Sequence, residues 1–120
     1  MYENDARRYH ILIQLLNWNI EDRYLPKTIA VYGAGNIGKI FKQKVSEKCV
    51  VKYFVDREKR GQYIDGLPVK GIEGMIEDAD TTLVVTATYD YENIYRDVRS
   101  LCPDVTIISL EDILKDNIKE

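Results

Sequence analysis

The sequence predicts an α/β protein with an open parallel sheet and helices on both of its faces. Short apolar segments of strand length alternate along the chain with amphipathic segments of helical periodicity, as expected for parallel strands joined by helices. A glycine-rich turn lies between the first of these strands and the helix that follows it. The 120 residues are enough for one hydrophobic core and too few for a second large domain.

The N-terminal segment is predicted to form a helix over residues 4–21. Its apolar side chains recur at steps of four and three residues, at Tyr2, Ala6, Tyr9, Ile13, Leu16 and Ile20. Leu12 and Leu15 broaden this stripe. Pro26 ends the connection, so we divide the chain into a helical extension, 1–25, and a main domain, 26–120. The apolar stripe needs a surface to cover it: the same domain, a second copy in a homodimer, or an associated catalytic domain.

The main domain alternates between strands and helices. Strands are predicted at 28–32, 50–55, 82–86 and 105–108, with a small hairpin at 63–69 around Asp65-Gly66. Pro68 argues against a central place for the second strand of that hairpin. Helices are predicted from Ile37 to Val45, at 72–77, at 91–101 and from about residue 111. Each crossover is expected to be right-handed.

The glycine-rich turn carries the strongest functional signal. Gly33 permits a tight turn out of the strand, Gly35 lets the backbone approach a diphosphate without a Cβ atom, and Gly38 lets the helix lie close to the strand. The free amides of Asn36 and Ile37, at the start of the helix, are expected to face the phosphate oxygens. The alternative is that the glycines serve only the turn and its packing. We favour a Rossmann-like nucleotide-binding domain.

Asp56 is the second member of the predicted site. It follows the second strand, 23 positions after Gly33, close to the offset at which an acid accepts hydrogen bonds from ribose hydroxyls. A solvated acid in a loop is the alternative reading. Arg57, with Lys59 and Arg60, could instead contact a 2′-phosphate, so the sequence favours NAD over NADP only mildly.

Polar residues also follow the third main strand. Thr86, Thr88 and Tyr89 leave its carboxyl end, the edge at which open parallel sheets place their ligands. They are candidates to line the site, and ordinary capping of the strand end is an equal alternative.

The sequence assigns no catalytic residue. Gly33 to Lys39 fits the beginning of a P-loop, but Ile40 stands where a magnesium-binding Ser or Thr is required. No tyrosine has a lysine four residues later, so the catalytic pair of a short-chain dehydrogenase is missing. The catalytic residues are therefore left unknown, and no nucleophile with an assigned base is found.

Composition argues against several other classes of function. The formal charge is −3 and no long run of charges has one sign, so the sequence lacks the basic segment expected of a nucleic-acid-binding protein. Cys49 and Cys102 are expected to be reduced thiols, and His10 is the only histidine, so no metal site is predicted. No segment resembles a signal peptide or a membrane span, which predicts a cytoplasmic protein.

From about residue 27 to 117, roughly three quarters of the chain, the sequence resembles the Rossmann-like domains of bacterial polysaccharide-biosynthesis proteins. The resemblance rests on the segments 29–39, 53–56, Gly61 and 64–69. Such domains form the N-terminal part of nucleotide-sugar dehydratases and epimerases and of sugar acyltransferases. The resemblance implies nucleotide binding at Gly33, Gly35, Gly38 and Asp56. It also implies NAD(P) or a UDP-sugar as the ligand. The chain lacks the acyltransferase repeats and the dehydratase catalytic domain.

The sequence therefore predicts a nucleotide-binding domain that favours NAD(H) and serves carbohydrate or cell-envelope metabolism without a complete catalytic apparatus. Two alternatives remain open. One is a sensing or scaffold module in which the nucleotide biases a partner interaction, and the other is a nucleotide-sugar- or CoA-binding subunit of a transferase. NAD, NADP, a UDP-sugar and CoA all present phosphate groups to the same turn, so the sequence does not choose among them.

Overall fold

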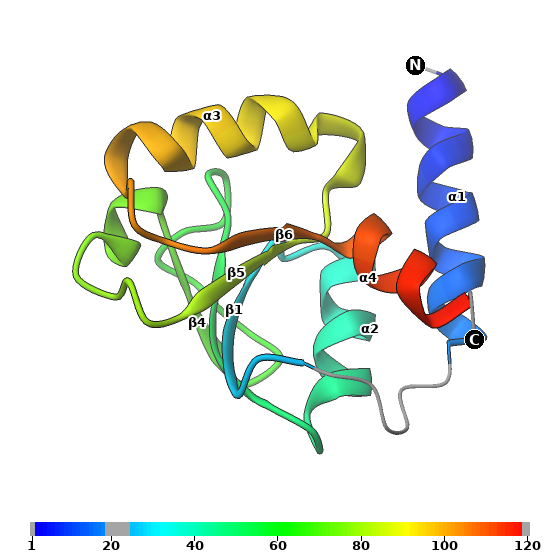
Figure 1. Cartoon of the computed structure of the whole chain (residues 1–120), viewed down its shortest axis with the longest axis horizontal. Coiled ribbons are helices and arrows are strands. Elements are labelled where there is room, and N and C mark those ends of the chain that lie inside the picture. The colour runs from blue at the N-terminus through cyan, green and yellow to red at the C-terminus, as the bar shows by residue number, and fades with distance from the viewer. Residues whose placement is uncertain (1, 19–24, 119–120) are drawn as a thin grey trace.

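Six strands form one open sheet in the order β3-β4-β2-β1-β5-β6 in the computed structural model, which describes residues 2–18 and 25–118 (Figure 1). The strands are β1 Thr28–Tyr32, β2 Val50–Val55, β3 Tyr63–Ile64, β4 Leu67–Lys70, β5 Thr82–Val85 and β6 Ile107–Ser109. All neighbours pair in parallel except β3 and β4, which form an antiparallel hairpin. The prediction of an α/β protein with a mostly parallel open sheet is confirmed.

Helices cover both faces of the sheet (Figure 1). The helical elements are α1 Tyr2–Leu16, α2 Asn36–Val45, η1 Ile72–Met75, η2 Thr88–Asp90, α3 Tyr91–Leu101 and α4 Leu110–Ile118, where η marks a 3₁₀ helix. In β1, Ile29 and Val31 pack with α1, α2 and α4, whereas Ala30 and Tyr32 pack with α3 and η1. A strand buried on both faces reads as a continuous apolar run, which is why β1 shows no polar alternation.

The hairpin adds an antiparallel edge to the sheet. Asp65 and Gly66, at its turn, both have positive φ angles, 52° and 82°. Such a turn matches the twist of the two strands that it joins. Pro68 lies in β4, whose partners are β3 on one side and β2 on the other, so β4 is one strand away from the edge. The last strand begins at Ile107, two residues later than the sequence predicted, and the helix predicted at 72–77 is only a short 3₁₀ turn.

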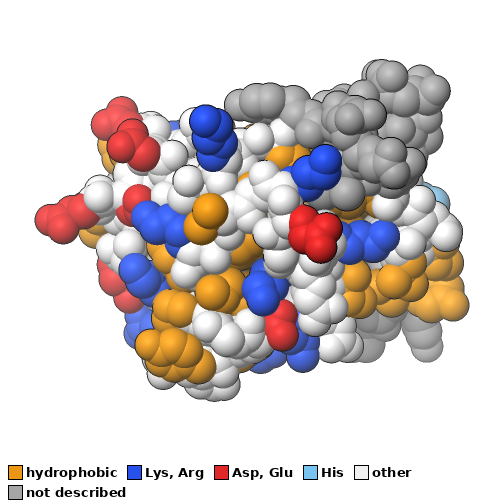
Figure 2. All heavy atoms as spheres, turned by 90° about the horizontal axis from the view of Figure 1, so that it is seen from below, with side chains coloured by type: hydrophobic (Ala, Val, Ile, Leu, Met, Phe, Trp, Pro, Cys, Tyr) orange, Lys and Arg blue, Asp and Glu red, His pale blue; other side chains and the backbone are white. Residues whose placement is uncertain are grey.

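The N-terminal helix packs on the rest of the chain through the margin of the predicted stripe, where Leu15 is buried and Leu12 is half-buried, and not through its centre. Ile11, Leu15 and Trp18 are buried, and Trp18 stacks on Phe41 of α2 with ring centroids 6.2 Å apart. The stripe itself is largely exposed: 66% of Tyr9, 44% of Ile13 and 56% of Leu16. Figure 2 shows apolar side chains gathered at the end of the molecule that α1 occupies. A second copy as the partner of this stripe stays a prediction.

The helix also ends earlier than predicted. It stops at Leu16 rather than at residue 21, and residues 19–24, including Ile20, lie outside the described residues. The ammonium group of Lys44 in α2 donates hydrogen bonds to the carbonyl oxygens of Leu16 at 3.1 Å and Trp18 at 3.2 Å. In a longer helix these carbonyls would accept hydrogen bonds from later backbone amides. Here the Lys44 ammonium takes that place and holds the end of α1 against α2.

Candidate functional site

A cavity of about 850 Å³ opens at the carboxyl edge of the sheet, where the chain order reverses between β1 and β5. From β1 the chain continues to β2 on one side, and it later returns to β5 on the other, so the loops after these strands diverge. Ligands of open parallel sheets bind in such a crevice. The cavity lies within the size range of small-molecule sites. It is lined by the segment 32–38 except Ala34, by 56–59, 86–87, 89–90, Asn93, Ile94 and Asp97, and by Tyr9 and Leu12 of α1.

Two glycines of the turn are required by the protein itself. Gly33 has a φ angle of 109°, in the region that favours glycine, and a Cβ atom there would lie 2.6 Å from Oγ1 of Thr86. At Gly38 a Cβ atom would lie 1.8 Å from the carbonyl oxygen of Gly33. These two positions must stay glycine for α2 to lie against the end of β1, whether or not a ligand binds.

Gly35 is different, because nothing in the protein requires a glycine there. Its φ angle is −86° in extended backbone, and a Cβ atom at this position would meet no atom within 4 Å. It lines the cavity and occupies the N-cap of α2, where it leaves the first amides of the helix without a side-chain acceptor. The first turn of α2 contains no acidic residue. The backbone here therefore presents amide donors and the positive end of the helix dipole to an open space.

The carboxylate of Asp56 holds the turn in place. Its Oδ2 accepts a hydrogen bond from the amide of Ala34 at 3.0 Å, and its Oδ1 accepts from the amides of Glu58 at 2.9 Å and Lys59 at 3.1 Å. The turn is also tied to β2 directly, because the amide of Gly33 donates to the carbonyl of Val55 at 2.8 Å. Oδ2 retains one of its two acceptor positions, so the group can hold the turn and still accept from a ligand.

The nearby cations are all engaged with the protein. Arg57 pairs with Asp97 of α3 at 2.9 Å, and Arg60 pairs with Glu73 at 2.8 Å. The ammonium of Lys59 lies 3.4 Å from the carbonyl oxygen of Ala34. Sequence reasoning offered these three cations for a 2′-phosphate, and the structure gives each of them another partner.

The residues after β5 divide between packing and the cavity. Thr86 lines the cavity, but its hydroxyl donates to the carbonyl of Tyr32 at 2.8 Å, and its Oγ1 occupies the space that a Cβ atom at position 33 would need. Thr88 is buried in η2 and is not among the residues that line the cavity. Tyr89 lines it. Of the nine predicted cofactor-binding residues, the structure gathers all but Thr88 around one cavity: Gly33, Gly35, Asn36, Ile37, Gly38, Asp56, Arg57 and Thr86.

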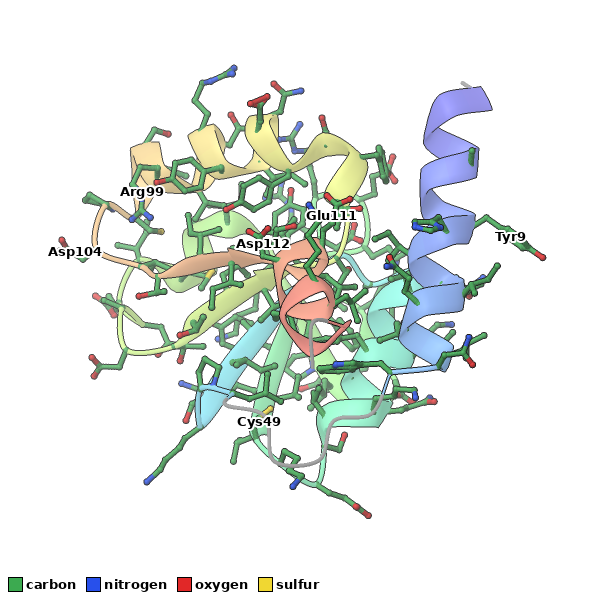
Figure 3. All side chains as sticks on the ribbon, turned by 45° about the vertical axis from the view of Figure 1, so that its right-hand side comes forward. Tyr9, Cys49, Arg99, Asp104, Glu111 and Asp112 are labelled. Carbon is green, nitrogen blue, oxygen red and sulfur yellow. The ribbon has the colours of Figure 1, made fainter. Side chains whose placement is uncertain are left out.

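Sequence reasoning missed the walls contributed by two helices. Asn93, Ile94 and Asp97 lie on one side of α3, at a spacing of three to four residues that could have identified a shared face. Tyr9 and Leu12 come from α1, and Figure 3 shows Tyr9 projecting from that helix away from the sheet. No local signal marks them, because their place depends on how α1 docks. Tyr32 also lines the cavity, and burial raises the pKa of its hydroxyl.

Both cysteines are free and buried, and burial raises the pKa of each thiol. Within residues 2–18 and 25–118, no group of three or more His, Cys, Asp or Glu side chains is placed to hold a metal ion. None of the helices in the described part of the chain is long and apolar enough to cross a membrane.

The sequence matches no model of a known protein family, and a search of curated proteins finds no match either.

Proposed function

We propose that this protein binds a nucleotide, with NAD(H) favoured, through the turn from Gly33 to Gly38. Gly35 carries the proposal. The protein itself requires glycine at positions 33 and 38, whereas at 35 the absent side chain leaves only open cavity in front of the amides of α2. A diphosphate is the group that needs this approach, since it binds backbone amides at a helix N-terminus.

The topology supports a Rossmann-like assignment. Numbered by chain order among themselves, the five parallel strands β1, β2, β4, β5 and β6 stand in the sheet as 3-2-1-4-5. That agrees with the first five strands of the order 3-2-1-4-5-6 of dinucleotide-binding domains, in which the glycine turn follows strand 1 and the acid follows strand 2. Gly33 and Asp56 occupy these two places.

The charges around Asp56 favour a free ribose over a 2′-phosphate. Arg57 and Arg60 are paired with carboxylates, and Asp56, Glu58, Asp90 and Asp97 line the cavity against only Arg57 and Lys59. A 2′-phosphate would bring a further negative charge to this acidic region. The proposal is therefore NAD(H), with NADP(H), a UDP-sugar and CoA as the ligands to be tested against it.

The proposal stops at binding. The cavity wall, in the described part of the chain, contains no cysteine, serine or histidine. A role beside or within an enzyme that modifies nucleotide sugars is proposed on the family resemblance alone.

The test is calorimetric titration of the protein with NAD⁺, NADP⁺, UDP-glucose and CoA. We expect NAD⁺ to bind most tightly. Gly35→Ser should abolish this binding while the protein stays folded, because serine suits an N-cap and its side chain would fill the space that the diphosphate needs. Unchanged affinity in a folded Gly35→Ser variant would remove the turn from the site, and preference for another of the four ligands would replace NAD(H).

A further inference from the structure

An ion pair joins the loop after β2 to α3. The guanidinium of Arg57 donates a hydrogen bond to Oδ2 of Asp97 at 2.9 Å, and both residues line the cavity. Arg57 comes directly after Asp56, whereas Asp97 lies 40 positions farther along the chain. The cation beside Asp56 is therefore held by a carboxylate from a helix that contributes neither the glycine turn nor the acid.

Arg57 stands where a 2′-phosphate would need a cation. In dinucleotide-binding domains the acid after strand 2 accepts hydrogen bonds from the ribose hydroxyls, and a nearby arginine accommodates the 2′-phosphate of NADP. Asp56 has the place of the acid, and Arg57 is the next residue. A 2′-phosphate would therefore compete with the Asp97 carboxylate for the same guanidinium.

We propose that Asp97 makes the site selective for NAD(H) over NADP(H) by holding Arg57 away from the ribose. This inference rests on the proposed function and names the residue of α3 that sets its specificity. Asp97 acts through Arg57 and is thus a positioning residue. The Arg57 and Asp97 side chains are 70% and 49% exposed, so the pair has the strength of a surface ion pair. Breaking such a pair changes an equilibrium by up to about fivefold.

The pair formed by Arg60 and Glu73 provides a matched control. Its two charged atoms are 2.8 Å apart, and its side chains are 60% and 58% exposed, close to the values for Arg57 and Asp97. Neither Arg60 nor Glu73 lines the cavity. Glu73→Gln therefore removes one negative charge and releases an arginine of the same loop, as Asp97→Asn does, but outside the cavity.

Calorimetric titration with NAD⁺ and NADP⁺ tests the proposal through the ratio of the two dissociation constants. The wild type should prefer NAD⁺. In Asp97→Asn we expect the ratio to shift about fivefold toward NADP⁺, and in Glu73→Gln it should stay at the wild-type value. Adding Arg57→Ala to Asp97→Asn should remove the shift, because the released guanidinium is then absent.

An unchanged ratio in Asp97→Asn, or loss of both ligands in that variant, would overturn the proposal and leave NAD⁺ binding by the wild type intact. An equal shift in Glu73→Gln would also overturn it, because net charge would then be the cause. So would a shift that persists without Arg57, since another cation such as Lys59 would then receive the phosphate, or a wild type that prefers NADP⁺. Failure of the wild type to bind either ligand would refute nucleotide binding itself.

Discussion

Two carboxylates at opposite edges of the sheet each accept several hydrogen bonds, but with different kinds of partner. Asp56, at the carboxyl edge, accepts from three backbone amides and lines an open cavity. Asp78, before β5 at the amino edge, accepts from the Tyr53 hydroxyl at 2.7 Å, from Thr81 at 2.9 Å and from the Lys52 ammonium at 3.0 and 3.1 Å. The hydrogen bonds to Asp56 come from backbone amides and hold a loop in place. Those to Asp78 come from side chains that surround its carboxylate.

The irregularity of β2 explains the closed cluster. Ile29 of β1 pairs with Val51, but Val31 pairs with Phe54, so Lys52 and Tyr53 together oppose the single residue Ala30. Successive side chains of a regular strand point to opposite faces, and an extra residue of this kind changes their direction. Both side chains can then reach Asp78. The amino edge is built for stability, and the carboxyl edge keeps backbone donors available to a ligand.

The largest effect is expected from Gly38→Ala. Its Cβ atom would overlap the backbone of Gly33, which has no flexible side chain to move away. We expect a loss of at least about 3 kcal/mol in the free energy of unfolding, measured by urea denaturation. Gly35→Ser should change that free energy by less than about 1 kcal/mol. Similar losses for both variants would show that Gly35 is structural too, and would weaken the contrast between the two edges.

Asp78→Ala should destabilise the protein by about 2–3 kcal/mol and leave the affinity for NAD⁺ unchanged. The hydroxyl of Tyr53, a residue only 2% exposed, would lose its acceptor. The ion pair with Lys52 adds less, because the Lys52 side chain is 40% exposed. Urea denaturation and a calorimetric titration measure the two quantities. A weaker affinity for NAD⁺ in this variant would mean that the two edges are coupled.

Asp56→Ala should affect binding as well as stability. If Asp56 accepts hydrogen bonds from the ribose hydroxyls, the variant should bind NAD⁺ more weakly by ~1.5–3 kcal/mol. It should also lose stability, since the amides of Ala34, Glu58 and Lys59 lose their acceptor. The same titration and denaturation experiments apply. If Asp56→Ala loses stability but keeps its affinity for NAD⁺, then Asp56 has a purely structural role, as Asp78 does.

The carboxyl edge was largely predictable because its signals are local. The signals are a buried strand, three glycines at fixed spacing and an acid after the next strand. Together they predict the turn, the edge of the sheet at which it lies, and eight of the nine candidate residues that line the cavity. Thr88 does not line the cavity, because it is buried in the short 3₁₀ helix after β5. The sequence gives no warning of that helix.

The amino edge and α1 were less predictable because both depend on tertiary contacts. Lys52 and Tyr53 both bond to Asp78 at the place where β2 is irregular, and local sequence does not signal that irregularity. The apolar residues of α1 form two stripes, and periodicity favoured the one containing Tyr9 and Ile13, which is exposed. The structure buries Leu15, at the margin of that stripe, together with Ile11, and Trp18 stacks on Phe41 beside them. Amphipathic periodicity alone does not reveal which stripe meets the core.

The smallest effect is the pH dependence of the amino edge. Burial would raise the pKa of Asp78 above its ordinary value of 3.8, but hydrogen bonds from Tyr53, Lys52 and Thr81 outweigh burial and lower it. A lowered pKa in the folded state means that the stabilisation is complete above the ordinary pKa and is lost as the pH falls through the folded one. The wild type should therefore have a larger free energy of unfolding than Asp78→Asn at pH 7, and this difference should shrink as the pH falls below the ordinary pKa of 3.8. Urea denaturation at pH 7 and at a pH below 3.8 measures the difference, and Tyr53→Phe provides the second background, in which the advantage should shrink because one donor is gone. An advantage that is the same at both pH values would show that the charge of Asp78 contributes nothing, and that this edge is held by packing alone.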